Sequence, residues 1–258
     1  MTDFLASIGA AFLTFLAAAG RLALFTGRAL AAGASPPYYP RMIARQIVFV
    51  GYYSLPVVGL TALFTGMVLA LQSYTGFARF NAEGAVATVV VLSVTRELGP
   101  VIAALMVAGR VGAAMAAEIG TMRVTEQIDA LTTLSTDPLR YLVLPRLLAG
   151  ALTLPALVLV ADIIGVFGGF LVGTYKLSFN PVAYLTQTEQ YLATTDVVSG
   201  LVKAAVFGFL VALMGCYQGY HSRGGAEGVG QATTYAVVSA SILILLSDYF
   251  LTQAFFAR

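Results

Sequence analysis

Arg96 and Glu97 are neighbouring ionisable residues inside an otherwise apolar stretch, TRELGPVIAALMVAGRVG. A charged side chain at the centre of a bilayer costs about 2.5–3.5 kcal/mol on insertion scales, so such a pair is tolerated where it faces protein, water or an opposite charge. We expect the pair to line an interior, either as a structural ion pair between helices or as a polar spot in a substrate path. Pro100 follows and weakens the helical hydrogen bonding locally.

Two aspartates, Asp162 and Asp248, each stand alone in a long apolar run. An isolated carboxyl in such surroundings has to be protonated, paired with a cation or hydrogen-bonded to a neighbouring helix. A structural hydrogen bond is the simpler interpretation. A proton relay through these residues is the alternative, and it would make the protein an ion-coupled secondary transporter.

Residues for catalysis or nucleotide binding are scarce. Lys176 and Lys203, the two lysines, are followed by leucine and alanine, so neither belongs to a phosphate-binding loop. His221 is the one histidine, which excludes a zinc pair of the H-E-x-x-H type, and no G-x-S-x-G motif occurs. Cys216 is the one cysteine, and we expect it to be a packing residue. We predict a protein that is not an enzyme and holds no cofactor or metal.

The composition indicates that lipid is the main solvent of the chain. Of 258 residues, 59% are hydrophobic and only 10% are charged, with a mean hydropathy of +0.87 and a net charge of +2. These values exclude an ordinary soluble domain and a nucleic-acid partner. About 20 helical residues cross a bilayer. The gaps between charges predict five membrane spans, at residues 47–73, 84–109, 147–175, 197–220 and 233–256.

Residues 1–33 differ from these spans. The apolar run is only 17 residues long, and Arg21 and Arg28, seven apart, share one helical face. We expect an amphipathic helix in the membrane interface rather than a span or a cleaved leader. Three prolines in AAGASPPYYP then end the helix at an elbow.

The distribution of Lys and Arg predicts the orientation, because basic residues are retained in the cytoplasm. Nine lie in residues 1–46, in the central loop and in the loop after the fourth span, whereas Arg79, Lys176, Lys203 and Arg258 lie on the other side. We therefore expect a cytoplasmic N-terminus and central loop, with the C-terminus in the opposite compartment.

Small residues recur at every fourth position in two spans. One strip comprises Ala104, Ala108, Gly112, Ala116 and Gly120, and the other Gly165, Gly169 and Gly173. Such strips let helix backbones approach closely. The pattern leaves open whether they pack within the chain or form a homodimer face.

A polar segment at residues 118–134 separates the second and third spans. It contains Glu118, Arg123, Glu126 and Asp129 among threonines and glutamine. An ordinary solvated loop is one interpretation. The other is a cytoplasmic helix that docks on a soluble partner, which suits a transporter without a nucleotide site of its own.

Three stretches resemble a known family. GMVLALQ at residues 66–72, TRELGPVIAALMVAGRVGAAMAAEIGTMRVTEQIDAL at 95–131 and DPLRYLVLPR at 137–146 are similar to the MlaE-type (YrbE-type) permeases of bacterial ABC transporters that work with MCE proteins. The resemblance covers nearly the whole chain and implies one permease domain, residues 1–258. The expected fold is an all-α integral membrane protein with an N-terminal interfacial helix, five spans and a cytoplasmic coupling helix between spans two and three.

The resemblance also implies a function and partners. A homodimer in the bacterial inner membrane would move phospholipid between that membrane and a periplasmic MCE hexamer, driven by a cytoplasmic ATPase dimer that binds ATP and Mg, with an attached STAS-domain protein in some members. Residues 118–131, including Glu118, Arg123, Glu126 and Asp129, would contact the ATPase. Arg96 and Glu97 would line the lipid cavity, with Glu97 orienting Arg96 toward a phosphate, and Leu69, Phe77 and Phe80 would form apolar walls.

Overall fold

A computed structural model describes residues 2–33, 36–80 and 82–256, and within these ranges the chain contains helices and turns but no strand. Six helical stretches are long and apolar enough to cross a membrane: Phe12–Ala32, Pro40–Phe80, Glu83–Val124, Leu139–Tyr175, Thr194–Tyr220 and Gly225–Phe256. The prediction of an all-α membrane protein is confirmed.

The helices follow one another with short connections. The α-helices are α1 Thr2–Ala32, α2 Pro40–Val50, α3 Leu55–Phe77, α4 Val86–Ser93, α5 Gly99–Val107, α6 Ala113–Val124, α7 Gln127–Thr133, α8 Leu144–Tyr175, α9 Pro181–Tyr191, α10 Thr194–Tyr220 and α11 Gly225–Phe256. Short 3₁₀ turns lie at η1 Tyr52–Ser54, η2 Ala78–Phe80 and η3 Glu83–Ala85, and π-helical turns lie at η4 Val94–Leu98, η5 Ala108–Gly112 and η6 Leu139–Val143.

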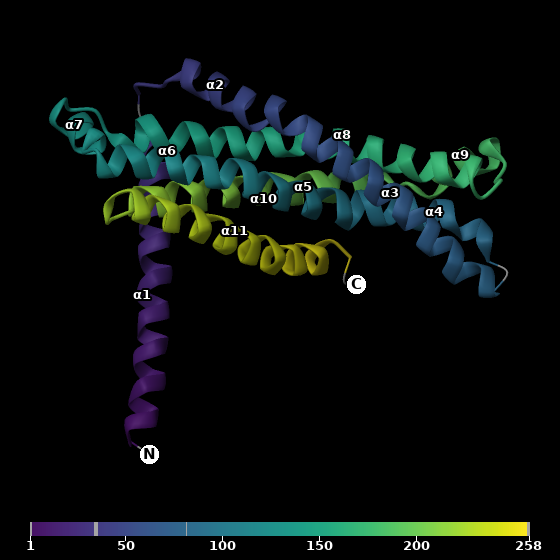
Figure 1. Ribbon diagram of the computed structural model, residues 1–258, viewed down its shortest axis with the longest axis horizontal. Coiled ribbons are helices and arrows are strands. Elements are labelled where there is room, and N and C mark those ends of the chain that lie inside the picture. Colours follow the sequence, from purple (N-terminus) through teal and green to yellow (C-terminus); the bar gives the residue numbers. More distant parts are fainter. Residues whose placement is uncertain (1, 34–35, 81, 257–258) are drawn as a thin grey trace.

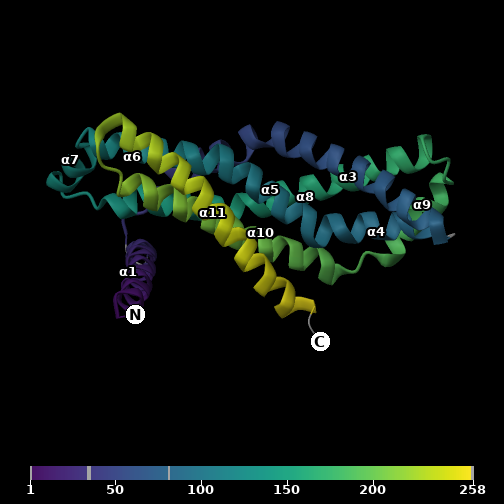
Figure 2. The same ribbon diagram turned by 60° about the horizontal axis from the view of Figure 1, so that its bottom comes forward.

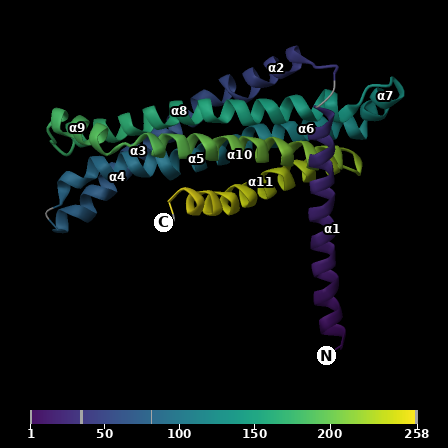
Figure 3. The ribbon, with the colours of Figure 1, turned by 180° about the vertical axis from the view of Figure 1, so that it is seen from behind.

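The long helices form an elongated bundle with α7 at one end and α9 at the other (Figure 1). Helix α8 packs against both α3 and α10, and α10 in turn packs against α6 and α11. Helix α11 crosses one face obliquely (Figure 2), and it ends partway along the bundle, whereas α3, α4 and α8 continue toward the α9 end (Figure 3).

The second span is longer than predicted. The expected span of 84–109 ended before Arg110, but the helix continues through η5 and α6 to Val124. Arg110 is tolerated inside it because its Nη2 donates to the Phe49 carbonyl at 2.6 Å and to Ser54 Oγ at 2.7 Å. These contacts satisfy the open carbonyl end of α2, where the chain kinks into η1. Arg110 is therefore not a loop residue.

Helix α1 runs across the direction of the other long helices (Figures 1 and 3). This direction favours the predicted interfacial position, although α1 is longer than the 17-residue run suggested. Its described contacts with α10 centre on Phe25, whose ring lies 5.4 Å from that of Tyr217 and 5.7 Å from those of Tyr220 and His221. His221 is exposed, and it takes part in docking α1.

Glycines bring the central helices into backbone contact. A Cβ at Gly66 in α3 would collide with the carbonyl oxygen of Gly165 in α8, and Gly208 in α10 meets Gly150 in α8 in the same way. All members of the two predicted strips are buried. Ala116 faces Gly219 of α10, and Gly169 faces Val90 of α4. Both strips therefore pack within the chain.

We expect Gly66→Ala to destabilise the protein by about 1–3 kcal/mol, because the added methyl group overpacks a contact between two backbones. The matched control is Gly76→Ala in the same helix, where a Cβ meets nothing within 4 Å. Alanine there should be neutral or slightly stabilising, since it favours helix over glycine. Thermal unfolding in detergent measures both, and equal melting temperatures for the two variants would contradict the packing account.

Candidate functional site

The polar centre of the bundle is built around the π-helical turn η4, which carries Arg96 and Glu97. Pro100 follows this turn and has no N–H, so it gives no hydrogen bond to the carbonyl four residues earlier, that of Arg96. The ammonium group of Lys203 in α10 donates to that carbonyl at 3.0 Å. The π turn and the proline thus leave a backbone carbonyl without its helical hydrogen bond, and a neighbouring helix supplies the donor instead.

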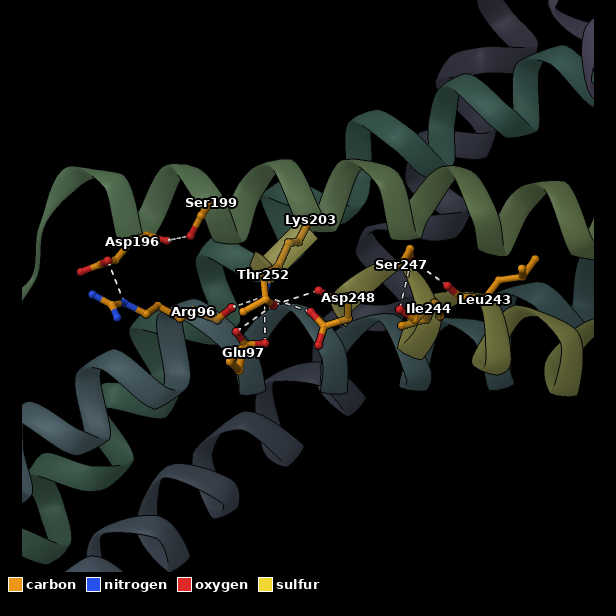
Figure 4. Close-up of polar contacts among 10 residues, drawn as sticks. All are labelled: Arg96, Glu97, Asp196, Ser199, Lys203, Leu243, Ile244, Ser247, Asp248 and Thr252. Atoms are coloured by element: carbon orange, nitrogen blue, oxygen red, sulfur yellow. Dashed lines mark hydrogen bonds and ion pairs between the residues drawn. The ribbon is translucent and has the colours of Figure 1, made fainter. Parts of the chain in front are cut away.

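Lys203 holds three helices together through its ammonium group. The side chain is fully buried, and Nζ lies 2.8 Å from Glu97 Oε2, 2.9 Å from Asp248 Oδ1 and 2.7 Å from Thr252 Oγ1 (Figure 4). The Thr252 hydroxyl also lies 3.1 Å from Glu97 Oε1. A buried ammonium group is stable only when it is paired with a negative charge and hydrogen-bonded, and Lys203 meets both conditions.

Arg96 turns away from Lys203 toward the first turn of α10 (Figure 4). Its Nε donates to Asp196 Oδ1 at 2.8 Å, and its guanidinium lies 4.6 Å from the centre of the Phe256 ring at the end of α11. Asp196 is buried, and its Oδ2 accepts the Ala193 N–H, which caps α10. The Arg96 side chain is 36% exposed, and within the described chain neither Nη makes a hydrogen bond to protein.

Two expectations about the pair need correction. Glu97 does not orient Arg96, because successive residues of a helix point in different directions and each finds its own partner on α10. The pair is also not halfway along its span, because the helix runs from Glu83 to Val124 and places η4 in its first half, level with the start of α10.

Sequence reasoning missed the roles of Asp196, Lys203 and Thr252. Asp196 and Lys203 are seven residues apart and therefore share a face of one helix. A lysine within an apolar run could have identified that face, but the orientation count places Lys203 at the membrane surface. If Lys203 is left out of that count, the same side of the membrane still has more Lys and Arg residues. Arg258, also in that count, lies outside the described residues.

The two isolated aspartates have different surroundings. Asp248 is paired with Lys203 and is therefore not isolated. Asp162 is buried and makes no hydrogen bond or ion pair within the described chain, and a Cβ at Gly99 would collide with its Oδ1. Within the described chain no hydrogen bond or ion pair joins the two residues, so a relay between them has no support. No group of three or more His, Cys, Asp or Glu side chains in the described ranges is arranged to hold a metal ion.

An apolar groove of about 440 Å³ runs along the outer face of α3 beside η4. Leu69 and Leu98 lie in its wall, together with Thr61, Phe64, Thr65, Val68 and Gln72. Of the other predicted wall residues, Phe77 is half-buried against the cluster around Val90, and Phe80 is 80% exposed at the end of η2. Leu98 brings the turn η4 to the groove, whereas Arg96 and Glu97 of the same turn point toward α10.

The predicted coupling residues lie at the α7 end of the bundle. Glu118 belongs to α6 and pairs with the buried Arg146 of α8 at 2.8 Å, while Arg123 pairs with Asp129 at 2.7 Å. Glu126 is exposed and adopts a left-handed backbone conformation with φ of 60°. The expected segment of 118–134 is thus the end of one helix and a separate short helix, α7.

We expect Lys203→Met to lower stability by about 3 kcal/mol, because removal of one partner leaves Glu97 and Asp248 without a cation. Lys176→Met is the matched control, since Lys176 is exposed after the end of α8. Chemical or thermal unfolding of the purified protein measures the difference. Equal stability of the two lysine variants would show that the buried ammonium does not hold these helices together.

Comparison with the sequences of known proteins identifies the family of this chain. Residues 43–254 match the sequence profile of the family Permease MlaE. A "Probable ABC transporter permease protein" of Rickettsia felis is 61% identical over 250 residues, which cover 97% of this chain and 96% of the relative. The "Intermembrane phospholipid transport system permease protein MlaE" of Haemophilus influenzae is 35% identical over 257 residues, covering 99% and 98%. "Protein TRIGALACTOSYLDIACYLGLYCEROL 1, chloroplastic" of Arabidopsis thaliana is 38% identical over 218 residues, covering 84% and 62%. This chain belongs to the MlaE family of ABC transporter permeases.

Proposed function

We propose that this permease moves phospholipid between the bacterial inner membrane and a periplasmic MCE carrier. One observation carries the proposal: the turn η4 contributes Leu98 to the wall of an apolar groove suited to acyl chains and also carries Arg96, whose two terminal nitrogens make no hydrogen bond within the described chain. An arginine fork matches the geometry of a phosphate. The name of the Haemophilus influenzae relative, which includes intermembrane phospholipid transport, supports the same substrate class.

We propose further that two copies work together with two ATPase subunits, which bind ATP and Mg, and with an MCE hexamer and in some cases a STAS-domain protein. The absence of a phosphate-binding loop from the sequence supports a separate ATPase. The arginine distribution supports a cytoplasmic α7 end and a periplasmic α9 end. Helix α7 and the end of α6 then form the coupling segment.

The ion-coupled alternative is weaker. It required Asp162 and Asp248 to act as proton sites, whereas Asp248 is engaged by Lys203 and the family is one of ABC permeases. ATP-dependent lipid transfer by the reconstituted complex separates the two functions. A proton gradient that drives transport by the purified permease alone would favour the alternative.

We expect Arg96→Ala and Glu97→Ala each to reduce ATP-driven lipid transfer at least about tenfold, a loss comparable to one charge-assisted hydrogen bond. Arg96→Lys keeps the charge beside Asp196 but lacks the fork, so it should restore stability better than transfer. Transfer between liposomes is the measurement, and Arg79→Ala, an exposed residue of η2, is the control. Wild-type transfer by both alanine variants would remove the pair from the mechanism.

We expect Glu126→Lys to weaken attachment of the ATPase without lowering the stability of the permease, because Glu126 is exposed and makes no ion pair within the described chain. Co-purification of the two subunits at increasing salt is the measurement. Glu189→Lys, the same charge reversal in α9 at the opposite end of the bundle, is the control. If both variants retain the ATPase equally, the coupling assignment is wrong.

A further inference from the structure

The charged centre contains more carboxylates than cations. Arg96 and Lys203 face Asp196, Glu97 and Asp248, so the five ionised groups carry a net charge of −1 (two positive, three negative). From this imbalance we propose that the site prefers phospholipids whose head group carries a primary ammonium, such as phosphatidylethanolamine, over anionic phospholipids. The inference rests on the proposed function and specifies its substrate class.

Lys203 has no capacity left for a ligand. An ammonium group has three N–H donors. Nζ already contacts the Arg96 carbonyl, Glu97, Thr252 and Asp248, and the side chain is fully buried. A lipid phosphate therefore meets Arg96, the cation of the site that is partly exposed and has terminal nitrogens without protein partners.

The excess negative charge lies on Glu97 and Asp248. Asp196 is neutralised by Arg96 and accepts the Ala193 N–H with its second oxygen. Glu97 and Asp248, in contrast, share one lysine, and their side chains are 39% and 20% exposed. In surroundings of low dielectric constant, such an uncompensated charge attracts a cation strongly.

The positions of these groups suit a zwitterionic head group. With the phosphate at Arg96, the acyl chains enter the groove beside Leu98, and the ammonium group lies in the field of the excess negative charge around Lys203, seven residues along α10 from Asp196. An anionic head group brings no cation and adds a second uncompensated negative charge. A choline head group brings a cation without N–H donors, so we expect an intermediate affinity.

The test uses the complete transporter in vesicles that contain equal amounts of phosphatidylethanolamine, phosphatidylcholine and phosphatidylglycerol, each labelled only on an acyl chain. We expect the ethanolamine lipid to be transferred about tenfold faster than the glycerol lipid, the factor expected of one partly exposed ion pair. The lipids that co-purify with the transporter, identified by mass spectrometry, should show the same order.

Two variants remove the excess charge. D248N and E97Q each bring the site to neutrality while keeping an oxygen that faces Lys203, so we expect the preference to fall to about twofold or less. E189Q is the matched control, since it removes one carboxylate from the exposed face of α9 and should keep the wild-type preference. E97Q serves in place of D248N if the latter does not fold.

The outcomes separate this inference from the proposed function. Equal transfer of the three lipids by the wild type overturns the inference and leaves phospholipid transport standing. A preference that persists in both D248N and E97Q also overturns it. Transfer of none of the lipids would overturn the inference and the proposed function together.

Discussion

A fully buried ammonium group within a membrane bundle is the constraint on which this structure depends. Without partners an ammonium group could not remain in the interior, because burying an unpaired charge has a high cost in free energy. The bundle meets this requirement from two other helices at once, with a carboxylate and a carbonyl from η4 and with a carboxylate and a hydroxyl from α11. The charged centre therefore also determines where η4, α10 and α11 cross.

The glycine contacts make this arrangement possible. The ionic groups lie on η4, α10 and α11, and Gly200 lets α10 approach η4, since a Cβ there would collide with the Thr95 carbonyl oxygen. Gly66, Gly165, Gly150 and Gly208 bring α3, α8 and α10 together in the same way. In lipid there is little hydrophobic force between helices, so close packing and hydrogen bonds determine association. Helices α3 and α11 also expose apolar side chains, and the groove lies along the exposed face of α3.

Ion pairs also connect the helices at the α7 end of the bundle. At the α7 end, charged residues pair near the surface, as in Arg123 with Asp129, and one pair reaches the interior through the buried Arg146. This pair connects α6 directly to the start of α8. Arg123 in turn joins the end of α6 to α7 through Asp129. The π turns η4 and η5 interrupt the same continuous helix, and such turns often occur at functional sites.

The sequence by itself determined the membrane class, the approximate spans, the strips of small residues and the need of Arg96 and Glu97 for partners inside the bundle, because composition, helical period and the cost of burying charge are all local properties of the chain. Only the tertiary structure decided which charges pair. Adjacent residues on a helix face different neighbours, and the partners Asp196, Lys203 and Asp248 lie far away along the chain. Likewise, Arg110 marked a span boundary in the sequence, yet it lies inside a helix because the kink between α2 and α3 offers carbonyls that no local pattern reveals.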